Sequence, residues 1–346
     1  MDVGEYMALC LSHPDHGYYM TRDPFGSQGD FTTAPEISQL FGEMIGVWMA
    51  DAWIKLGSPG PFALVECGPG RGTLMADIMR ATAKVPGFRE AARIHLMEIS
   101  PVLKAKQAEM LSAYSPVWID DLEGVPADMP VLLVGNEFFD ALPVRQLERR
   151  NGQWLERVIG LGEGDVLAWG VKDADPHILA ALPERILKDG ADGIYETPVP
   201  INHFVKSLSN ILLKQRGAAL FLDYGYSKSK AGDSLQAIRS HRFVDVFDTP
   251  GASDLTVHVD FENVRRVAER NGAVYVGPVT QAEFLRAMGI EIRAERLAAN
   301  ADVTQGDSLR AGLLRLIDTS VPESMGALFK VCALCHDESF KPAGFP

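Results

Sequence analysis

Three closely spaced glycines are the part of this sequence best suited to hold a ligand. They follow an acidic residue in a strand-to-helix turn, and the residues concerned are Glu66, Gly68, Gly70, Gly72 and Thr73. Glycine lets a backbone approach a ligand closely, and the first N–H groups of a helix that begins at Thr73 can hold an anionic group. A dinucleotide-binding loop has its third glycine one position later, and a P-loop ends in Gly-Lys-Ser or Gly-Lys-Thr, so neither motif fits. The alternative is a tight turn without a ligand.

The order of acidic residues on the following strands narrows the kind of ligand. The spacing G-x-G-x-G after an acidic strand end resembles that of class I methyltransferases, which bind S-adenosylmethionine. Glu98 ends the next strand, where a carboxylate can accept hydrogen bonds from both ribose hydroxyls. Asp120 and Asp121 end the third strand, at the usual place for a contact to the adenine amino group. Each carboxylate alone could be a solvated strand end, but together they predict S-adenosylmethionine as the cofactor.

The fourth strand ends in residues that suit a methyl acceptor. Several amino-group methyltransferases carry Asn or Asp followed by Pro-Pro-aromatic here, and that side chain accepts a hydrogen bond from the methylated nitrogen. This chain has Asn136 followed by Glu137, and a carboxylate suits a guanidinium, which is charged at any accessible pH. Asp140 lies three residues on, where a helical turn would return it to the same side. We predict catalytic roles for these three residues, and the alternative is that they cap a following helix.

Histidines and a late strand end supply further candidates. His258 is the histidine most suspected of facing the acceptor, with a buried structural histidine as the alternative. The segment 223–225 ends the fifth strand and points to the ligand side by topology, or forms a simple turn. His13 and His16 flank Pro-Asp without obvious further ligands, so we expect turn residues and predict no metal site.

A C-x-x-C-H pattern near the end of the chain needs weighing. Cys332, Cys335 and His336 have the spacing of c-type haem attachment, but the sequence shows no export signal. The surrounding residues read as an apolar strand, in which positions three apart face opposite sides. We therefore expect a plain strand rather than a haem or metal site.

The elements that position these residues follow from hydrophobic patterns. From Phe62 onward, apolar runs alternate with helical patterns, which predicts βαβ units and a parallel sheet. The run 131–135 is fully apolar, so we expect a central strand. The prediction is an α/β fold of the class I methyltransferase type: a Rossmann-like, mostly parallel seven-stranded sheet. It spans 62–346 and carries insertions at about 145–199 and 227–260.

The first insertion and the N-terminal segment differ from the βα pattern. Alternating polar and apolar residues on both sides of Asn151-Gly152 predict a β-hairpin. Residues 1–61 contain a helical pattern over 37–56, and we expect an N-terminal helical cap. We expect the cap and the insertions to cover the carboxyl ends of the strands, where open α/β sheets bind ligands.

Composition excludes several classes of protein. The chain has 346 residues and a formal net charge of −13, which argues against nucleic acid or an anionic membrane surface as a partner. No apolar run approaches the roughly 18 residues of a membrane-spanning helix, and the start lacks the features of a signal peptide. We expect a cytoplasmic bacterial protein, with the mature form of a mitochondrial matrix protein as the alternative. Whether it forms homo-oligomers is left open.

Longer motifs resemble one known family. The segments 13–20, 29–43, 136–143 and 254–261 together resemble the MidA family, and the likeness runs from about Glu5 to about Val331. That family consists of S-adenosylmethionine-dependent methyltransferases, whose mitochondrial members are assembly factors of respiratory complex I and protein arginine methyltransferases. The resemblance implies symmetric dimethylation of an arginine on a complex I subunit; bacterial members need not share that substrate.

The N-terminal motif and the overall function each have alternatives. Asp30, with Thr32, Thr33 and Glu36, could fold over the ligand as a lid that excludes water, or form a loop and helix cap. The leading functional hypothesis is a protein arginine methyltransferase. The alternatives are an assembly chaperone that binds S-adenosylmethionine without catalysis and a small-molecule methyltransferase.

Overall fold

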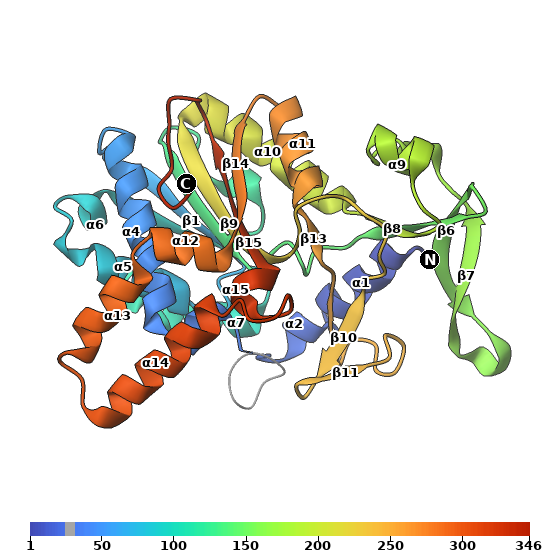
Figure 1. The fold of residues 1–346 in the computed structure, drawn as a ribbon, viewed down its shortest axis with the longest axis horizontal. Helices are drawn as coiled ribbons and strands as arrows, with labels where there is room; N and C mark the ends of the chain where they lie inside the picture. The colour runs from blue at the N-terminus through green and yellow to red at the C-terminus, as the bar shows by residue number, and fades with distance from the viewer. Residues whose placement is uncertain (25–31) are drawn as a thin grey trace.

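A central β-sheet lies between two layers of helices in the computed structural model, which describes residues 1–24 and 32–346 (Figure 1). The strand order is β14-β15-β9-β4-β1-β2-β3, and the short β13 pairs with the end of β9. β15 is antiparallel to both of its neighbours, while the other pairs are parallel. The predicted mostly parallel, seven-stranded sheet is therefore confirmed, with β13 as an addition. The strands are β1 (Phe62–Cys67), β2 (Ala92–Met97), β3 (Val117–Ile119), β4 (Val131–Asn136), β9 (Gly217–Tyr226), β13 (Val259–Asp260), β14 (Val274–Thr280) and β15 (Phe329–Cys335).

The middle of the sheet is apolar because its strands are covered on both faces. Every residue of β4 and of β1 is buried, and β4 lies between β1 and β9 as the apolar run predicted. Alternate side chains of β4 enter two separate hydrophobic clusters, one on each face of the sheet.

Different sets of helices cover the two faces of the main sheet. One face is covered by α4 (Gln39–Lys55), α5 (Thr73–Ala81), α6 (Phe88–Ala91), α12 (Gln281–Ala287), α13 (Ile290–Ala298), α14 (Val303–Ile317) and α15 (Met325–Leu328). The other face is covered by α10 (Val199–Gln215) and α11 (Phe261–Arg270). α7 (Pro101–Met110) connects β2 to β3. Short 3-10 turns complete this part: η1 (Thr82–Lys84), η2 (Ser112–Tyr114) and η3 (Leu122–Gly124).

The first insertion forms a separate antiparallel sheet, seen at the right of Figure 1. Its order is β7-β6-β5-β8, with β5 (Arg145–Arg150), β6 (Gln153–Leu161), β7 (Leu167–Asp173) and β8 (Gly193–Thr197); η4 (Glu163–Asp165), α8 (Pro176–Leu179) and α9 (Glu184–Asp189) lie between strands. The predicted hairpin is confirmed: β5 and β6 are joined by Asn151 and Gly152, whose φ angles are +50° and +79°.

The second insertion contains three short antiparallel strands that pack against the N-terminal helix. These are β10 (Gln236–Arg239), β11 (Arg242–Val244) and β12 (Asp254–Thr256), in the order β11-β10-β12. One hydrophobic cluster joins them to α1 (Val3–Ser12) and α2 (Tyr18–Thr21). α3 (Ala34–Ile37) and α4 lie against the main sheet layer instead, so residues 1–61 contribute to two parts of the molecule. The boundary near residue 62 stays a prediction.

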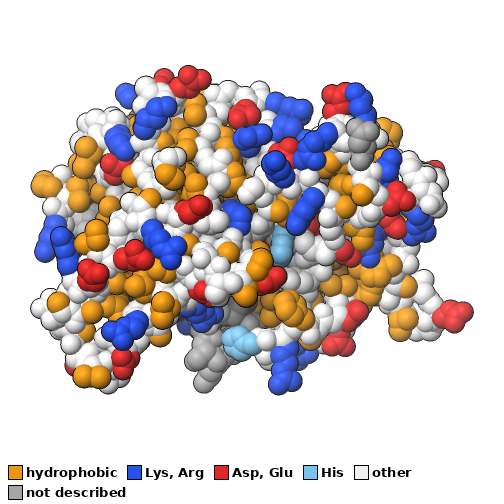
Figure 2. Space-filling view, viewed as in Figure 1, with side chains coloured by type: hydrophobic (Ala, Val, Ile, Leu, Met, Phe, Trp, Pro, Cys, Tyr) orange, Lys and Arg blue, Asp and Glu red, His pale blue; other side chains and the backbone are white. Residues whose placement is uncertain are grey.

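The surface carries both signs of charge over the face shown in Figure 2, with Lys and Arg gathered over α10 and α11. In the described ranges, 1–24 and 32–346, no helix is long and apolar enough to cross a membrane.

Candidate active site

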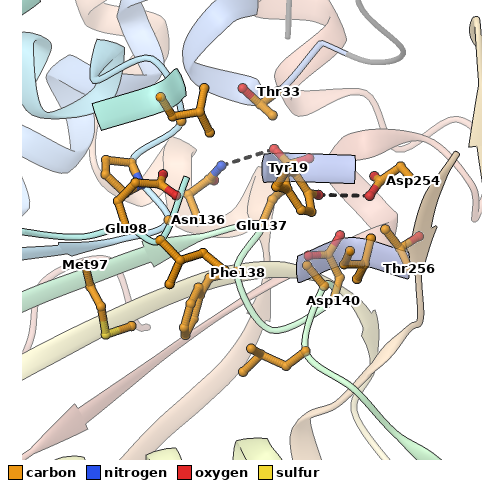
Figure 3. A pocket seen from close by; sticks show the side chains of 18 of the residues that line it. Tyr19, Thr33, Met97, Glu98, Asn136, Glu137, Phe138, Asp140, Asp254 and Thr256 are labelled. Atoms are coloured by element: carbon orange, nitrogen blue, oxygen red, sulfur yellow. Dashed lines mark hydrogen bonds between the residues drawn. The ribbon is translucent and has the colours of Figure 1, made fainter. Parts of the chain in front are cut away.

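A cavity of about 880 Å³ lies at the carboxyl ends of β1, β2, β3 and β4. This volume is within the range of small-molecule sites. Most of the residues predicted from the sequence line it, namely Glu66, Gly68, Gly70, Thr73, Glu98, Asp120, Asp121, Asn136, Glu137, Asp140 and His258. Gly72 does not line it, and Asp30 lies outside the described residues. Figure 3 shows the site on both sides of Glu137. Glu98 and Asn136 lie on one side, whereas Asp140 and Thr256 lie on the other.

The glycine turn needs glycine because its backbone is left-handed. The φ angles are +62° at Gly68, +54° at Gly70 and +88° at Gly72. Gly72 is the N-cap residue of α5, so it directs the first turn of that helix rather than lining the cavity. A Cβ atom built on Gly68 would lie 3.3 Å from the ring of Phe138, which leaves little room between this loop and the end of β4.

Glu66 gives a test of whether a cofactor fits. Its side chain is 2% exposed, and its Oε2 atom has no hydrogen-bond partner among the described residues. Burial raises the pKa of Glu66 well above its usual range, although a hydrogen bond from the Met75 backbone opposes this. An unpaired acceptor in such surroundings is costly. A ligand with a cationic amine would satisfy it, and the methionine part of S-adenosylmethionine has one.

Glu98 is held at the cavity wall by two donors. Its Oε1 accepts from the Ser100 N–H at 2.8 Å and its Oε2 accepts from Gln107 Nε2 at 3.1 Å. Burial raises the pKa of Glu98, and these hydrogen bonds oppose the rise. The carboxylate is thereby oriented while each oxygen retains a lone pair for a hydroxyl donor.

Gln107 is a positioning residue that sequence reasoning missed. Fully buried on α7, it also donates to the Gly70 carbonyl at 2.7 Å and accepts from Trp118 Nε1 at 2.8 Å. One amide thus ties the glycine loop to Glu98. Its only sequence signal is its position four residues after Leu103, on the buried side of the helix.

Asp120 and Asp121 lie at the exposed end of the cavity. Asp120 pairs with Lys104 at 3.2 Å and its side chain is 83% exposed. Asp121 accepts from the Glu123 N–H at 2.8 Å and caps η3. One oxygen of each carboxylate therefore already has a partner, so these contacts do not distinguish Asp120 from Asp121 as an acceptor for a ligand.

Glu137 occupies an unusual backbone position at the end of β4. Its φ is +51°, a left-handed conformation that is uncommon for residues other than glycine, and its N–H donates to the Leu222 carbonyl at 2.9 Å. Its Oε1 accepts from the Ala34 N–H at 3.3 Å and from Asn136 Nδ2 at 3.1 Å. Loss of contact with water, and then the nearby Asp140, raise the pKa of Glu137 to about 8.

The segment after Glu137 is a turn and not a helix. No helix follows among residues 138–144, and the chain enters β5 at Arg145, so the alternative of a helix cap is wrong. The expected helical turn that would carry Asp140 back is also wrong. Asp140 reaches the cavity because Asp223 Oδ2 accepts from the backbone N–H groups of residues 138, 139 and 140, at 3.1, 2.9 and 3.2 Å. Asp223 itself stays behind the cavity wall.

Asp140 and Asn136 complete the group around Glu137. Asp140 is buried and hydrogen-bonded to Tyr224, and burial raises its pKa to about 6. Asn136 Oδ1 is buried without a hydrogen-bond partner in the described part of the chain. Two carboxyl groups and a free amide oxygen therefore lie beside one another, which is an arrangement that favours a cationic ligand with N–H donors.

His258 lines the same cavity from the other side. Its ring packs edge-on against Tyr224 with centroids 5.4 Å apart. Burial, followed by the charges of Lys230 and Lys330, lowers the pKa of His258, so the ring is neutral at pH 7. A neutral imidazole can accept a proton or a hydrogen bond without repelling a cation.

The N-terminal segment contacts both halves of the site. Thr73 Oγ1 donates to Glu36 Oε1 at 2.5 Å, and the Ala34 N–H donates to Glu137. Tyr19, which sequence reasoning missed, lines the cavity and donates to Asp254 at 2.9 Å (Figure 3). Whether this segment moves as a lid stays a prediction.

The predicted turn at His13 and His16 and the predicted strand at Cys332 and Cys335 are confirmed. His13 and His16 lie in a turn with stacked rings 5.1 Å apart. Cys332 and Cys335 are buried in β15 on opposite faces of the sheet. Over residues 1–24 and 32–346, no group of three or more His, Cys, Asp or Glu residues is arranged to hold a metal ion.

Comparisons with known proteins identify relatives along nearly the whole chain. A family model described as "Putative S-adenosyl-L-methionine-dependent methyltransferase" matches residues 44–279. The protein arginine methyltransferase NDUFAF7 homolog, mitochondrial, of Drosophila melanogaster is 35% identical, over 99% of this chain and 84% of that protein. Protein arginine methyltransferase NDUFAF7, mitochondrial, of Homo sapiens is 34% identical, over 96% of this chain and 79% of that protein. A crystal structure from Burkholderia thailandensis, bound to S-adenosyl-homocysteine, has a TM-score of 0.81 and 28% identity, over 97% of this chain and 87% of that one.

Proposed function

Because the chain belongs to a family of S-adenosylmethionine-dependent methyltransferases, we propose that it methylates a guanidinium nitrogen of arginine in a protein. The enzyme class and the cofactor follow from the family, whose Burkholderia relative holds S-adenosyl-homocysteine. Two curated relatives named as protein arginine methyltransferases support a protein acceptor. We also propose which residues bind the cofactor and which bind the acceptor.

In this proposal the cofactor lies along the ends of β1, β2 and β3. Glu66 binds the amine, the loop from Gly68 to Thr73 binds the carboxylate, Glu98 binds the ribose, and Asp120 or Asp121 binds the adenine. When bound, S-adenosylmethionine supplies an electrophilic methyl group on a sulfonium.

The acceptor would lie against Glu137 and Asn136. An ionised Glu137 accepts one guanidinium N–H and Asn136 Oδ1 accepts another, which fixes the plane of the group and turns one nitrogen toward the cofactor. As the bond from that nitrogen to the methyl carbon forms, the carbon–sulfur bond would break with its electron pair left on sulfur, and the nitrogen would lose a proton. Asp140, with a pKa of about 6, can accept the proton.

One observation carries the choice of arginine: an unpaired Asn136 oxygen lies next to two carboxyl groups whose pKa values are raised by burial. A neutral acceptor would do nothing to favour the ionised carboxyl groups, whereas a guanidinium supplies a positive charge that favours them and several N–H donors.

The test uses methyl-labelled S-adenosylmethionine and the proteome of a strain that lacks the protein. We expect the purified chain to label arginine in one or a few proteins, and the Gly70→Val variant to label none. Label on lysine, or only in the small-molecule fraction, would contradict the proposal. Full complementation of the strain without any methylated product would favour an assembly chaperone.

The proposal extends to a partner and a place in the cell. The resemblance described above supports a subunit of respiratory complex I as the acceptor. It is compatible with the cytoplasm of a bacterium or with the mitochondrial matrix. Mass spectrometry of that complex, purified from strains with and without the chain, would test the acceptor.

A further inference from the structure

The cavity has a second arm, lined by one face of the sheet β10–β12. The side chains of Gln236, Ile238, Phe243, Asp254 and Thr256 all line the cavity. The pairing explains why they share a face, since Gln236 lies opposite Thr256, and Ile238 lies opposite both Asp254 and Phe243. The alternate residues Ala237 and Leu255 point the other way and are buried with α1.

The inner end of this face is polar, and its groups are paired. Gln236 Nε2 donates to Thr256 Oγ1 at 3.1 Å, and Thr256 is also hydrogen-bonded to Tyr224. Tyr224 is in turn hydrogen-bonded to Asp140. The inner end is therefore joined to the proposed acceptor site by an unbroken set of contacts.

The outer end of the same face is apolar at Ile238 and Phe243, and the neighbouring Asp254 accepts a hydrogen bond from Tyr19. Ile238 is two residues further along β10, about 7 Å from Gln236 at the usual rise per residue. Phe243, its cross-strand neighbour, is 74% exposed although it lines the cavity. Burial of an aromatic side chain of this size by a ligand is strongly favourable.

We propose that this outer end binds an apolar side chain that lies within two residues of the target arginine in the acceptor protein. The inference rests on the proposed function, because the arginine is what brings the acceptor into the cavity. Side chains two residues apart in an extended peptide are about 7 Å apart and point to the same side, so a residue that flanks the arginine can share one face of the peptide with it. The occupant is a peptide segment because one cavity provides both the carboxyl groups and this apolar row.

The test measures peptide binding to the full chain saturated with S-adenosyl-homocysteine, which prevents turnover. Three fluorescent nonapeptides are compared: one has an arginine with two leucines on each side, the second has glycines in place of the leucines, and the third keeps the leucines but has glutamine in place of the arginine. Phe243→Ala is the test variant, and Leu161→Ala is the matched control, since Leu161 is 70% exposed and lies outside the cavity.

We expect wild type to bind the leucine peptide at least tenfold more tightly than the glycine peptide. Phe243→Ala should reduce this preference to less than threefold, with unchanged affinity for the cofactor product, while Leu161→Ala retains it. Binding that requires arginine but ignores leucine would overturn the inference and leave the proposed function standing. Binding that requires leucine but ignores arginine would support the apolar site and contradict the proposed function. Failure of all three peptides to bind would overturn the inference.

Discussion

Glu137→Gln separates cofactor binding from methyl transfer. Glutamine has nearly the same shape, and its Oε1 can still accept from the Ala34 N–H and from Asn136 Nδ2. What changes is the other end of the group: an acceptor oxygen becomes an NH₂ donor, and the negative charge is lost. A guanidinium placed there would meet a donor instead of an acceptor.

The size of the effect follows from the interactions removed. A hydrogen bond to a charged group contributes about 1.5–3 kcal/mol, and loss of a preorganised electrostatic partner costs about 2.7–4 kcal/mol of barrier. We therefore expect a loss of about 2–4 kcal/mol, which corresponds to a roughly 30- to 1,000-fold slower methyl transfer. Affinity for S-adenosylmethionine should barely change, because the cofactor contacts proposed above involve other residues.

The pH dependence provides a second signature of the same group. Because the pKa of Glu137 is raised to about 8, its carboxyl is ionised in the free enzyme only above that pH. kcat/KM should therefore rise up to about pH 8 and then level off, and this rise should be absent in Glu137→Gln. The free energy of unfolding should change with pH in the opposite direction to kcat/KM. Between pH 4.5 and 8 the folded state holds a proton that the unfolded state has lost, so the free energy of unfolding falls as pH rises, and the variant lacks this fall.

The assay combines calorimetry for the cofactor with transfer of labelled methyl groups to a protein or peptide acceptor. Glu163→Gln, the same change at an exposed turn between β6 and β7, is the matched control and should behave as wild type. Wild-type transfer and an unchanged pH profile in Glu137→Gln would refute the assignment of the carboxylate to the acceptor. A loss of cofactor affinity equal to the loss of rate would refute the separation of the two half-sites.

Four further substitutions test the site. Gly70→Val should abolish binding of S-adenosylmethionine in calorimetry while circular dichroism shows a folded chain, because φ is +54° and a β-branched side chain would occupy the ligand side; unchanged affinity would refute the loop assignment. Glu98→Ala should weaken the same binding at least tenfold, and an unaltered Kd would place the ribose elsewhere. Gln107→Met should weaken it about tenfold and lower the Tm, since three buried groups lose their partner; a changed Tm with intact affinity would mean a purely structural role. Asp223→Asn should reduce kcat more than cofactor affinity, because it loosens the turn that carries Asp140, and equal loss of both would argue against this.

The main sheet and the cofactor half of the site could be predicted from the sequence. β1, β2 and β4 have six residues each and are mostly apolar, and a carboxylate or amide residue lies at or next to the end of each one. Parallel strands bring these ends to one edge of the sheet. The sequence alone therefore predicts that Glu66, Glu98 and Asp120 line one cavity, and no tertiary contact has to be known for this prediction.

The acceptor half depends on contacts that no local pattern encodes. Tyr19 meets Asp254 across 235 residues of sequence, and Asp223 holds a turn more than 80 residues earlier in the chain. The positive φ of Glu137 gave no signal either, because such positions are usually marked by Gly, Asn or Asp.

The short strands of the second insertion could not be predicted from the sequence for a related reason. β11 and β12 have three residues each, which is too few for an alternating pattern to stand out, and their common face appears only once they are paired. The helices over 281–317 were also not anticipated, although capping residues such as Thr280 and Asp302 mark two of their starts.

The four residues of α3 have a thermodynamic consequence. Glu36 in this turn accepts from Thr73 at the start of α5, and Ala34 in the same turn donates to Glu137. A ligand that displaces α3 from one contact therefore disturbs the other. Thermodynamic linkage then requires reciprocity: if the cofactor raises the affinity for the acceptor by some factor, the acceptor raises the affinity for the cofactor by the same factor. With the half-sites as proposed, this one short turn contacts both of them and provides a route for such coupling.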